Sequence, residues 1–246
     1  MQPVTGASTT DPLEQALGGI HGGRVLDVAT GRGGFAQVLV EKLGGYRQIV
    51  GVDLTASMIA AAANEVTADN VHFIRMDAER LGFGDGSFDT VSLSASLHHL
   101  SDAASVFVEI RRTLKIGGRL IVAEMHRDVT TEQELTSVRL HTWAAGVDLA
   151  LGWPHHATLT RQGILDLVGA LDLANLSVYD WIDVDSDPLD EEMIASLEGV
   201  LDRYLSEARG LEGYQEIEAQ ADALRRRFRE FGARDEPRII IVGEKP

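Results

Sequence analysis

The sequence has no cysteine among its 246 residues. Disulfides, thiolate metal sites and a cysteine nucleophile are therefore excluded, and the absence is typical of a cytoplasmic protein. Long apolar runs are missing too, since none approaches the roughly 20 residues that a membrane-spanning helix needs. The first residues show no basic head followed by an apolar run. We therefore expect a cytoplasmic protein with no secretory signal and no membrane span.

Positive charge is scarce. Lysine occurs only at positions 42, 115 and 245, and 38 acidic residues against 22 lysines and arginines give a formal net charge of −16. Such a charge repels the phosphates of nucleic acids, which basic residues must neutralise for binding. The one basic cluster, at 225–227 and 229, lies in a helical pattern among acids and is interpreted as a solvated helix face. We expect a small-molecule substrate and no nucleic-acid partner.

Hydrophobic residues make up 44% of the chain, which suits one domain over 1–246 with a buried core. Segments with helical periodicity separate the first five apolar runs, and this alternation predicts right-handed βαβ units and a doubly wound parallel sheet. The predicted strands are 24–29, 48–52, 71–76, 89–95 and 119–125.

After residue 125 the alternation breaks. Residues 126–160 form an insertion with a helical middle, which we interpret as a lid over a ligand site in preference to the alternative that its apolar residues are ordinary core. These residues are Trp143, Val147, Leu149, Leu151 and Trp153. A helix at 160–171, a strand at 176–184 and a last strand at 238–242 are predicted to follow the lid.

A helical pair at 188–231 is predicted between the last two strands, and it could form a dimer interface or cover the sheet. Asp187 is the expected cap of its first helix, with Pro188 next. The expected apolar faces are Leu189, Met193, Leu197, Val200, Leu201 and Tyr204 in the first helix, and Tyr214, Ile217, Ala221, Leu224, Phe228 and Phe231 in the second.

The first predicted strand runs into a glycine-rich turn that opens a helix. Gly31 and Gly33 lack side chains where a ligand has to approach the backbone, and the helix start offers free N–H groups. Asp53 ends the second strand, where a carboxylate can accept both ribose hydroxyls of an adenosine. These features alone fit an NAD-binding protein equally well, because Gly31, Gly33 and Ala36 match the dinucleotide-binding spacing.

Further motifs distinguish this sequence from that of an NAD-binding protein. Asp77 ends the third strand, where an acid can accept the exocyclic amine of adenine, and Phe88-Asp89-Thr90-Val91 opens the fourth. Together with Val25-Leu26-Asp27, Gly51-Val52-Asp53 and 114–120, these motifs occur in order over about residues 20–125. In this respect the sequence resembles the class I S-adenosylmethionine (SAM)-dependent methyltransferases, in particular the type 11 group related to ubiquinone and menaquinone biosynthesis.

The resemblance implies a seven-stranded, mostly parallel Rossmann-like sheet in the order 3-2-1-4-5-7-6 with an antiparallel last strand. It also implies which residues bind SAM. Thr30 departs from the smaller residue that is usual there, and either narrows the pocket or donates a hydrogen bond. The implied cofactor-binding set is Asp27, Ala29, Thr30, Gly31 and Gly33 for the methionine part, Asp53 for the ribose, Leu54, Met58, Asp77 and Ala78 for the adenine, and Ser94 for the methionine ammonium.

Catalytic residues are harder to predict, because SAM is already activated and the protein mainly has to position the acceptor. A base is needed only if the acceptor must lose a proton, and histidine with an ordinary pKa near 6.5 suits that role. The candidates are His98 and His99 after the fourth strand, His126 after the fifth and His141 in the insertion. His155 and His156 could cap the next helix. No carboxylate–histidine spacing is convincing for metal ligands, so no metal site is predicted.

The sequence therefore predicts a methyltransferase that uses SAM and a small-molecule acceptor by direct displacement. An NAD(P)-dependent oxidoreductase is one alternative, which leaves Asp77 and Phe88-Asp89 unexplained. A SAM-binding protein without catalysis is the other. Without cysteine, cysteine-based methylation of cytosine C5 or arsenite is excluded, and Ser94-Ala95-Ser96-Leu97 lacks the motif for amino-group methylation of nucleic-acid bases. A homodimer remains possible.

Overall fold

The computed structural model describes residues 11–182 and 185–246. Its centre is a seven-stranded sheet in the order β3-β2-β1-β4-β5-β7-β6, in which β7 runs antiparallel to both of its neighbours. The fold expected from the resemblance is thereby confirmed. The strands are β1 Arg24–Val28, β2 Gln48–Asp53, β3 Val71–Arg75, β4 Phe88–Ser94, β5 Leu114–Met125, β6 Ala174–Trp181 and β7 Arg238–Glu244.

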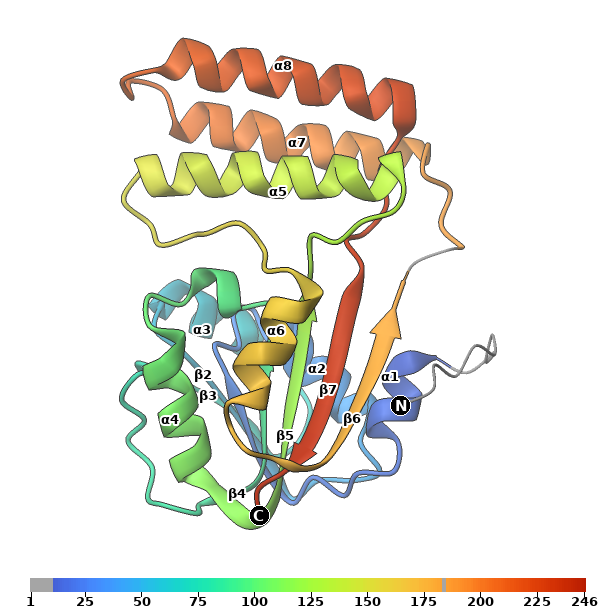
Figure 1. Ribbon diagram of the computed structural model, residues 1–246. Helices are drawn as coiled ribbons and strands as arrows, with labels where there is room; N and C mark the ends of the chain where they lie inside the picture. The colour runs from blue at the N-terminus through green and yellow to red at the C-terminus, as the bar shows by residue number, and fades with distance from the viewer. Residues whose placement is uncertain (1–10, 183–184) are drawn as a thin grey trace.

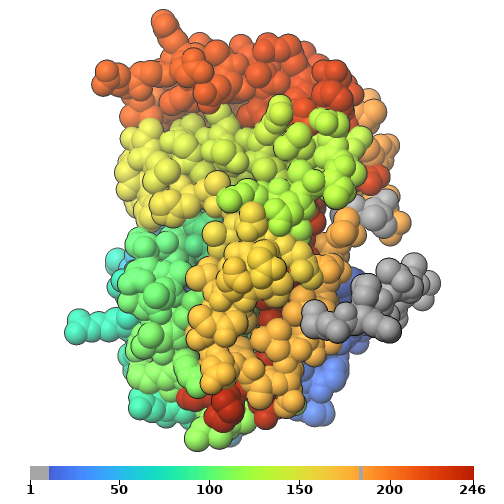
Figure 2. Space-filling model, in the orientation of Figure 1, coloured from blue at the N-terminus to red at the C-terminus, as the bar shows by residue number. Residues whose placement is uncertain are grey.

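Helices cover both faces of the sheet (Figure 1). One face carries α1 Pro12–Leu17, α2 Gly34–Lys42 and α3 Ala56–Glu65, and the other carries α4 Ala103–Thr113 and α6 Arg161–Gly169. A third group, which we call the three-helix layer, lies beyond the carboxyl ends of the parallel strands. It consists of α5 Glu132–Ala150, α7 Glu191–Glu207 and α8 Tyr214–Phe231. Figure 2 shows this layer stacked on the sheet part of the molecule.

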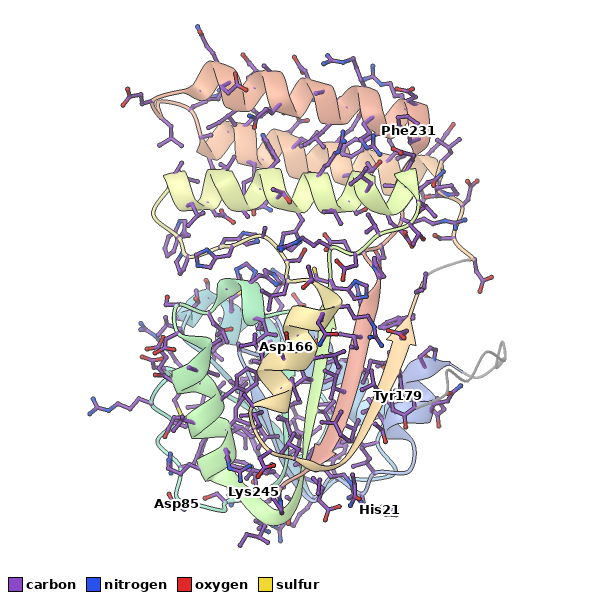
Figure 3. All side chains as sticks on the ribbon, viewed as in Figure 1. His21, Asp85, Asp166, Tyr179, Phe231 and Lys245 are labelled. Carbon is purple, nitrogen blue, oxygen red and sulfur yellow. The ribbon has the colours of Figure 1, made fainter. Side chains whose placement is uncertain are left out.

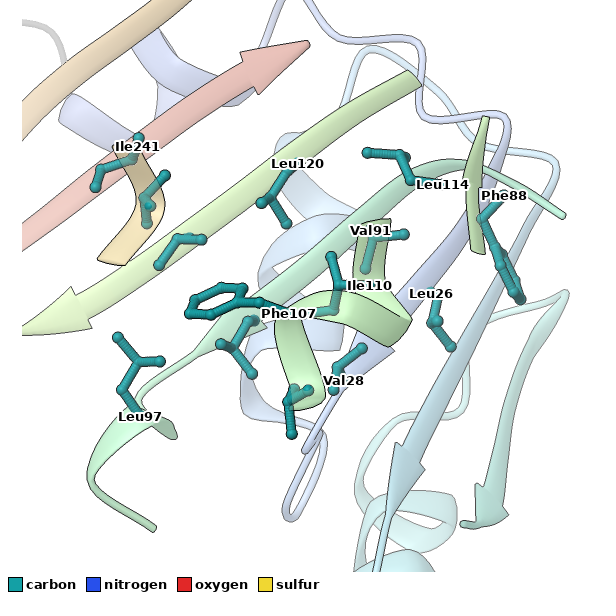
Figure 4. Close-up of a cluster of buried hydrophobic side chains, with 14 of the residues drawn as sticks. Leu26, Val28, Phe88, Val91, Leu97, Phe107, Ile110, Leu114, Leu120 and Ile241 are labelled. Atoms are coloured by element: carbon teal, nitrogen blue, oxygen red, sulfur yellow. The ribbon is translucent and has the colours of Figure 1, made fainter. Parts of the chain in front are cut away.

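The main core forms where α4 and α6 pack on the sheet (Figure 4). Phe107 and Ile110 of α4 meet strand residues such as Leu26, and all three are almost fully buried. Alternate strand residues such as Val25 face the other way, against α1 and α2. Burial on both faces explains why the strands read as continuous apolar runs in the sequence.

The three-helix layer has its own core, in which Trp143 of α5, Tyr204 of α7 and Phe228 of α8 are buried together. The Trp143 indole N–H donates to the Ile217 carbonyl at 3.2 Å. Of the residues interpreted as a lid, Trp143 and Val147 therefore belong to this core. Trp153, by contrast, is 66% exposed.

Two predicted boundaries are wrong. β5 begins at Leu114 rather than 119, because Leu114 already pairs with Phe88 ahead of an irregularity in the β4–β5 register. α7 is capped by Asp190, whose carboxylate accepts from the Met193 N–H, directly before two glutamates that favour a helix start. Asp187 instead accepts from the Leu189 N–H in the preceding turn, which leaves Leu189 largely exposed.

Other boundaries agree closely with the sequence. Asp11 caps α1 with Pro12 at its first position, as is typical of helix starts. The predicted strand 176–184 corresponds to β6, which begins two residues earlier, at Ala174, and ends at Trp181; residues 183 and 184 lie outside the described residues. Over residues 11–182 and 185–246, no helix is long and apolar enough to span a membrane.

Candidate active site

The glycine-rich turn between β1 and α2 is held in left-handed backbone conformations. The φ angles of Ala29, Gly31 and Gly33 are 52°, 55° and 84°. A side chain added at Gly31 would meet no protein atom within 4 Å, so this part of the turn faces open space. Gly33 is the N-cap of α2, but an added side chain there would lie 2.8 Å from Val66, so packing inside the protein requires this glycine, and the predicted reason of ligand approach is wrong for it. The turn therefore presents bare backbone at Gly31 and a helix N-terminus beside it.

Asp27 lies beneath this turn and is 1% exposed. Its two carboxylate oxygens accept hydrogen bonds from the Thr30 hydroxyl at 2.6 Å and the Ser92 hydroxyl at 2.7 Å. The Thr30 side chain thus donates a hydrogen bond, which was one of the two roles considered for it. Asp27 ties the turn to β4, so its effect on a ligand is transmitted through Thr30 and the backbone.

Burial raises the pKa of Asp27 to about 6, against the effect of the two hydroxyl donors. Because the carboxyl of the unfolded chain has a pKa near 3.8, the folded state binds this proton more tightly. The associated stability is present below about pH 4 and is lost as the pH rises through about 6.

We predict that Asp27→Asn removes this pH dependence. Between about pH 4 and 6, the free energy of unfolding of the wild type should fall relative to that of the variant by up to about 3 kcal/mol. Urea unfolding of both proteins across this pH range measures the two free energies of unfolding. The contributions of other titrating groups cancel in their difference. If both free energies changed with pH in the same way, the pKa of Asp27 would not be raised in the folded protein.

Asp53 connects the end of β2 to the same turn. One carboxylate oxygen accepts from the Gly31 N–H at 3.0 Å, and the other accepts from the Thr55 N–H at 2.9 Å. The side chain is only half-buried, so its remaining lone pairs can face a ligand. Leu54 and Met58 follow it and are 62% and 39% exposed, which leaves an apolar surface beside the carboxylate.

The other predicted cofactor residues lie along the same carboxyl edge. Asp77 is exposed after β3, and one of its oxygens accepts from the Glu79 N–H at 2.9 Å. Ala78 is half-buried against the main core. Ser94, at the end of β4, is half-buried. The Ser96 hydroxyl donates to the Ala29 and Ser94 carbonyls and so joins the ends of β1 and β4.

A cavity of about 220 Å³ begins at Ser94 and extends towards α1, β7 and β6. Its walls are largely apolar and aromatic, and they include Phe35, Met125 and Trp181. Arg238 contributes a positive charge and lies 4.9 Å from the centre of the Trp181 ring. The cavity is therefore suited to a small molecule with an apolar body.

Four histidines gather between the carboxyl edge of the sheet and the three-helix layer. His98 and His99 belong to a short 3-10 helix at Leu97–His99, His141 to α5 and His155 to the loop after α5. Five pairs of these rings have centroids 4.2 to 5.4 Å apart. Three of the four predicted catalytic histidines are thus brought together. The fourth, His126, is buried at the end of β5, and its Nδ1 has no partner among the described residues.

Burial and the neighbouring imidazoles lower the pKa of His98 to about 2. The same two causes lower the pKa of His99 to about 4. Burial also lowers the pKa of His126. At neutral pH these rings are therefore neutral and weaker bases than a histidine with its ordinary pKa.

Carboxylates surround the cluster. Asp148 Oδ2 lies 2.6 Å from His155 Nδ1 and also accepts from the Tyr204 hydroxyl at 2.9 Å. Glu236 Oε1 lies 3.2 Å from His141 Nδ1. Glu124 Oε2 lies 3.9 Å from His98 Nδ1, while its other oxygen accepts from the N–H groups of residues 96 and 97. Burial raises the pKa of Glu124 to about 7.

The positions of several of these residues in the site could not be predicted from the sequence. Asp148 and His155 come from the insertion, while Tyr204 and Glu236 come from distant parts of the chain, so no short motif joins them. Ser92 and Ser96 are ordinary strand-end serines until the β1–β4 pairing places them beside the turn. The closeness of the histidines depends on how α5 folds back over the sheet, which spacing alone does not reveal.

Comparison with known proteins agrees with the geometry of the turn. Residues 26–122 match the family model described as a methyltransferase domain. This segment of the chain is a class I SAM-dependent methyltransferase domain. It contains the end of β1, all of β2 to β4 and most of β5, with the glycine-rich turn and Asp53, so the resemblance seen in the sequence is confirmed. The three-helix layer lies outside the matched segment.

Curated relatives align over the same region. A ubiquinone/menaquinone biosynthesis C-methyltransferase of Hahella chejuensis is 34% identical over 110 residues, which are 43% of this chain and 44% of the relative. A demethylmenaquinone methyltransferase of Thermus thermophilus is 38% identical over 103 residues, or 41% of this chain and 46% of the relative. The alignments thus span less than half the length of these relatives.

A solved structure is similar in fold to nearly the whole of this chain. Phosphoethanolamine N-methyltransferase 2 of Haemonchus contortus, in complex with S-adenosyl-L-methionine, superposes with a TM-score of 0.56 at 18% identity. The superposition covers 95% of this chain and 51% of that one. At this level of identity the match concerns the fold alone.

Proposed function

We propose that this protein transfers a methyl group from SAM to a small-molecule acceptor. The observation that carries the proposal is the Gly31 turn. Its backbone faces open space and is fixed by Asp53, at the carboxyl edge where doubly wound folds bind nucleotides. The family match of residues 26–122 supports SAM rather than NAD as the ligand of this turn.

SAM is proposed to lie across the carboxyl ends of β1, β2 and β4. Its ribose would meet Asp53, and its adenine would lie between Leu54, Met58 and Asp77. The methionine part would follow the turn towards Ser94, which lines the cavity described above. Methyl transfer is then a direct displacement, in which the protein aligns the acceptor and excludes water.

The acceptor is proposed to be an apolar or aromatic molecule that fills the cavity between Phe35, Met125 and Trp181. Arg238 favours an acceptor that carries an anionic oxygen there. The quinone-pathway relatives support this class, although the segment that they share with this chain leaves out β6 and β7. We further propose that the three-helix layer closes over the site. A cytoplasmic location, a homodimer and the lack of a nucleic-acid partner remain predictions from composition and pattern.

Isothermal titration with SAM, S-adenosylhomocysteine and NADH tests the proposal. We expect micromolar binding of SAM and its product and no binding of NADH. In Gly31→Ala the new methyl group enters the ligand space, and we expect SAM affinity to fall about tenfold or more. Gly117→Ala is the matched control, since Gly117 also has a positive φ and open surroundings but pairs with Lys245 at the opposite end of the sheet (Figure 3).

Binding of NADH in place of SAM would contradict the proposal in favour of an oxidoreductase. Equal affinities in the two alanine variants would show that SAM does not lie on the turn. The remaining alternative is a SAM-binding protein without catalysis. Transfer of a labelled methyl group to phenolic and quinol acceptors distinguishes an enzyme from such a protein. A protein that binds SAM but methylates none of a broad acceptor panel would fit a sensor better than an enzyme.

A further inference from the structure

The histidine cluster contains an arrangement that suits the binding of a cation. The Nε2 atoms of His141 and His155 lie 3.0 Å apart. The other ring nitrogen of each faces a carboxylate, at 3.2 Å for His141 and 2.6 Å for His155. The hydrogen bond to Asp148 favours the tautomer of His155 in which Nδ1 carries the proton, and the negative charge of Glu236 favours the same tautomer of His141.

With the protons on Nδ1, both Nε2 atoms present lone pairs to each other. Two lone pairs at this distance repel unless a positive charge lies between them. Neutral imidazole nitrogens are also the commonest metal ligands in proteins. The His141–His155 pair is therefore arranged as two ligands directed at a common cation.

His98 supplies a third nitrogen. One ring nitrogen from each of His98, His141 and His155 lies within 4.8 Å of the others. Nitrogens bound tetrahedrally to one zinc ion at about 2.0–2.1 Å lie roughly 3.4 Å apart, so His98 has to move towards the His141–His155 pair when the ion binds. The backbone helps to fix this geometry, since the His156 N–H donates to the His98 carbonyl at 2.7 Å and holds the loop against the 3-10 helix.

The surrounding carboxylates form a second layer. Metal-bound histidines commonly direct their other nitrogen at a carboxylate, which fixes the tautomer and makes the ligand more basic. Asp148 and Glu236 occupy these places for His155 and His141, and Glu124 lies farther off, at 3.9 Å, for His98. The Tyr204 hydroxyl donates to Asp148 and so holds that carboxylate in place.

We propose that His98, His141 and His155 bind one divalent transition-metal ion, and that this ion is Zn²⁺. Three histidine ligands without a fourth protein ligand are typical of zinc sites that keep one position open for water or substrate. The absence of cysteine excludes a thiolate alternative. His98 lies inside the segment that matches the methyltransferase family model, whereas His141 of α5 and His155 of the loop after α5 lie outside it, so two of the three proposed ligands come from the part that the model does not match.

The proposal does not depend on methyl transfer, and its test measures metal directly. Protein freed of metal with a chelator is titrated with Zn²⁺ by calorimetry, and Co²⁺ is added in parallel to record its visible absorption. We expect one ion per chain and the intense bands of four-coordinate Co²⁺. His141→Ala and His155→Ala should each weaken Zn²⁺ binding by at least about a hundredfold.

Two further variants make the test selective. His72→Ala is the matched control, because His72 is an exposed histidine on β3 and its loss should leave Zn²⁺ affinity unchanged. Asp148→Asn keeps all three imidazoles and should weaken binding about 10- to 100-fold. Circular dichroism would show whether an alanine variant fails to fold. In that case Asp148→Asn still tests the proposal.

Several outcomes would overturn the proposal. These are a wild type that binds no more Zn²⁺ than the surface-histidine background, binding that His155→Ala and Asp148→Asn leave unchanged, and Co²⁺ spectra of a six-coordinate ion. Any of these would leave the His141–His155 pair as two rings that share a proton.

Discussion

Replacing Asp53 with alanine should lower SAM affinity about a thousandfold. The carboxylate is proposed to accept both ribose hydroxyls, and hydrogen bonds to a charged group contribute about 1.5–3 kcal/mol each. The substitution also removes the acceptor of the Gly31 N–H, so the turn that faces the methionine part is loosened at the same time. Isothermal titration with SAM measures the loss.

Asp69→Ala is the matched control for this experiment. Asp69 is exposed and lies just before β3, at the end of the sheet away from the proposed ligand. Its loss should leave SAM affinity unchanged. If Asp53→Ala folded normally and kept SAM affinity within a factor of two of the wild type, the ribose could not lie on Asp53.

Replacing Gly232 with alanine should destabilise the protein by at least about 3 kcal/mol. Gly232 ends α8 with a φ of 72°, and a methyl group there would lie 2.1 Å from the Pro188 carbonyl oxygen. Backbone cannot move aside as a flexible side chain can, so overpacking adds to the cost of the left-handed conformation. The Ala233 N–H donates to the same carbonyl, and this bond would be disturbed as well.

Gly213→Ala provides the comparison. Gly213 has a φ of 80° at the start of α8, but a methyl group there would meet no atom within 4 Å. We expect it to cost only about 1–2 kcal/mol, from the backbone conformation alone. Urea unfolding of both variants measures the two effects. Equal losses would show that the contact between Gly232 and Pro188 does not hold the three-helix layer in place.

The sheet could be predicted from the sequence because its signals are local. The inner strands are buried on both faces, so Val25 and Leu26 mark β1 without reference to the rest of the fold. Gly31, Asp53 and Asp77 follow strands directly, and parallel pairing brings strand ends to one edge. The proposed cofactor residues can accordingly be named from the sequence. Strand order came from the family resemblance, not from the residues themselves.

The upper part of the molecule could not be predicted in the same way. The sequence indicated helices at 126–160 and 188–231, but not that α5 packs with α7 and α8 in one layer. Trp143 was therefore interpreted as a lid residue, although it is buried in that layer. His155 was interpreted as a possible cap of the next helix, because its contacts with Asp148 and His141 depend on the path of the loop after α5. The loop is not helical, so the helical periodicity carries no information about these contacts.

A crystal structure with S-adenosylhomocysteine tests the central claim most directly. The account predicts that the ribose hydroxyls lie within hydrogen-bond distance of the Asp53 carboxylate. It also predicts that the homocysteine part runs over Gly31 towards Ser94, with the sulfur directed at the cavity that Phe35 and Trp181 line. A ligand bound elsewhere, or an adenosine that leaves Asp53 unpaired, would contradict the account.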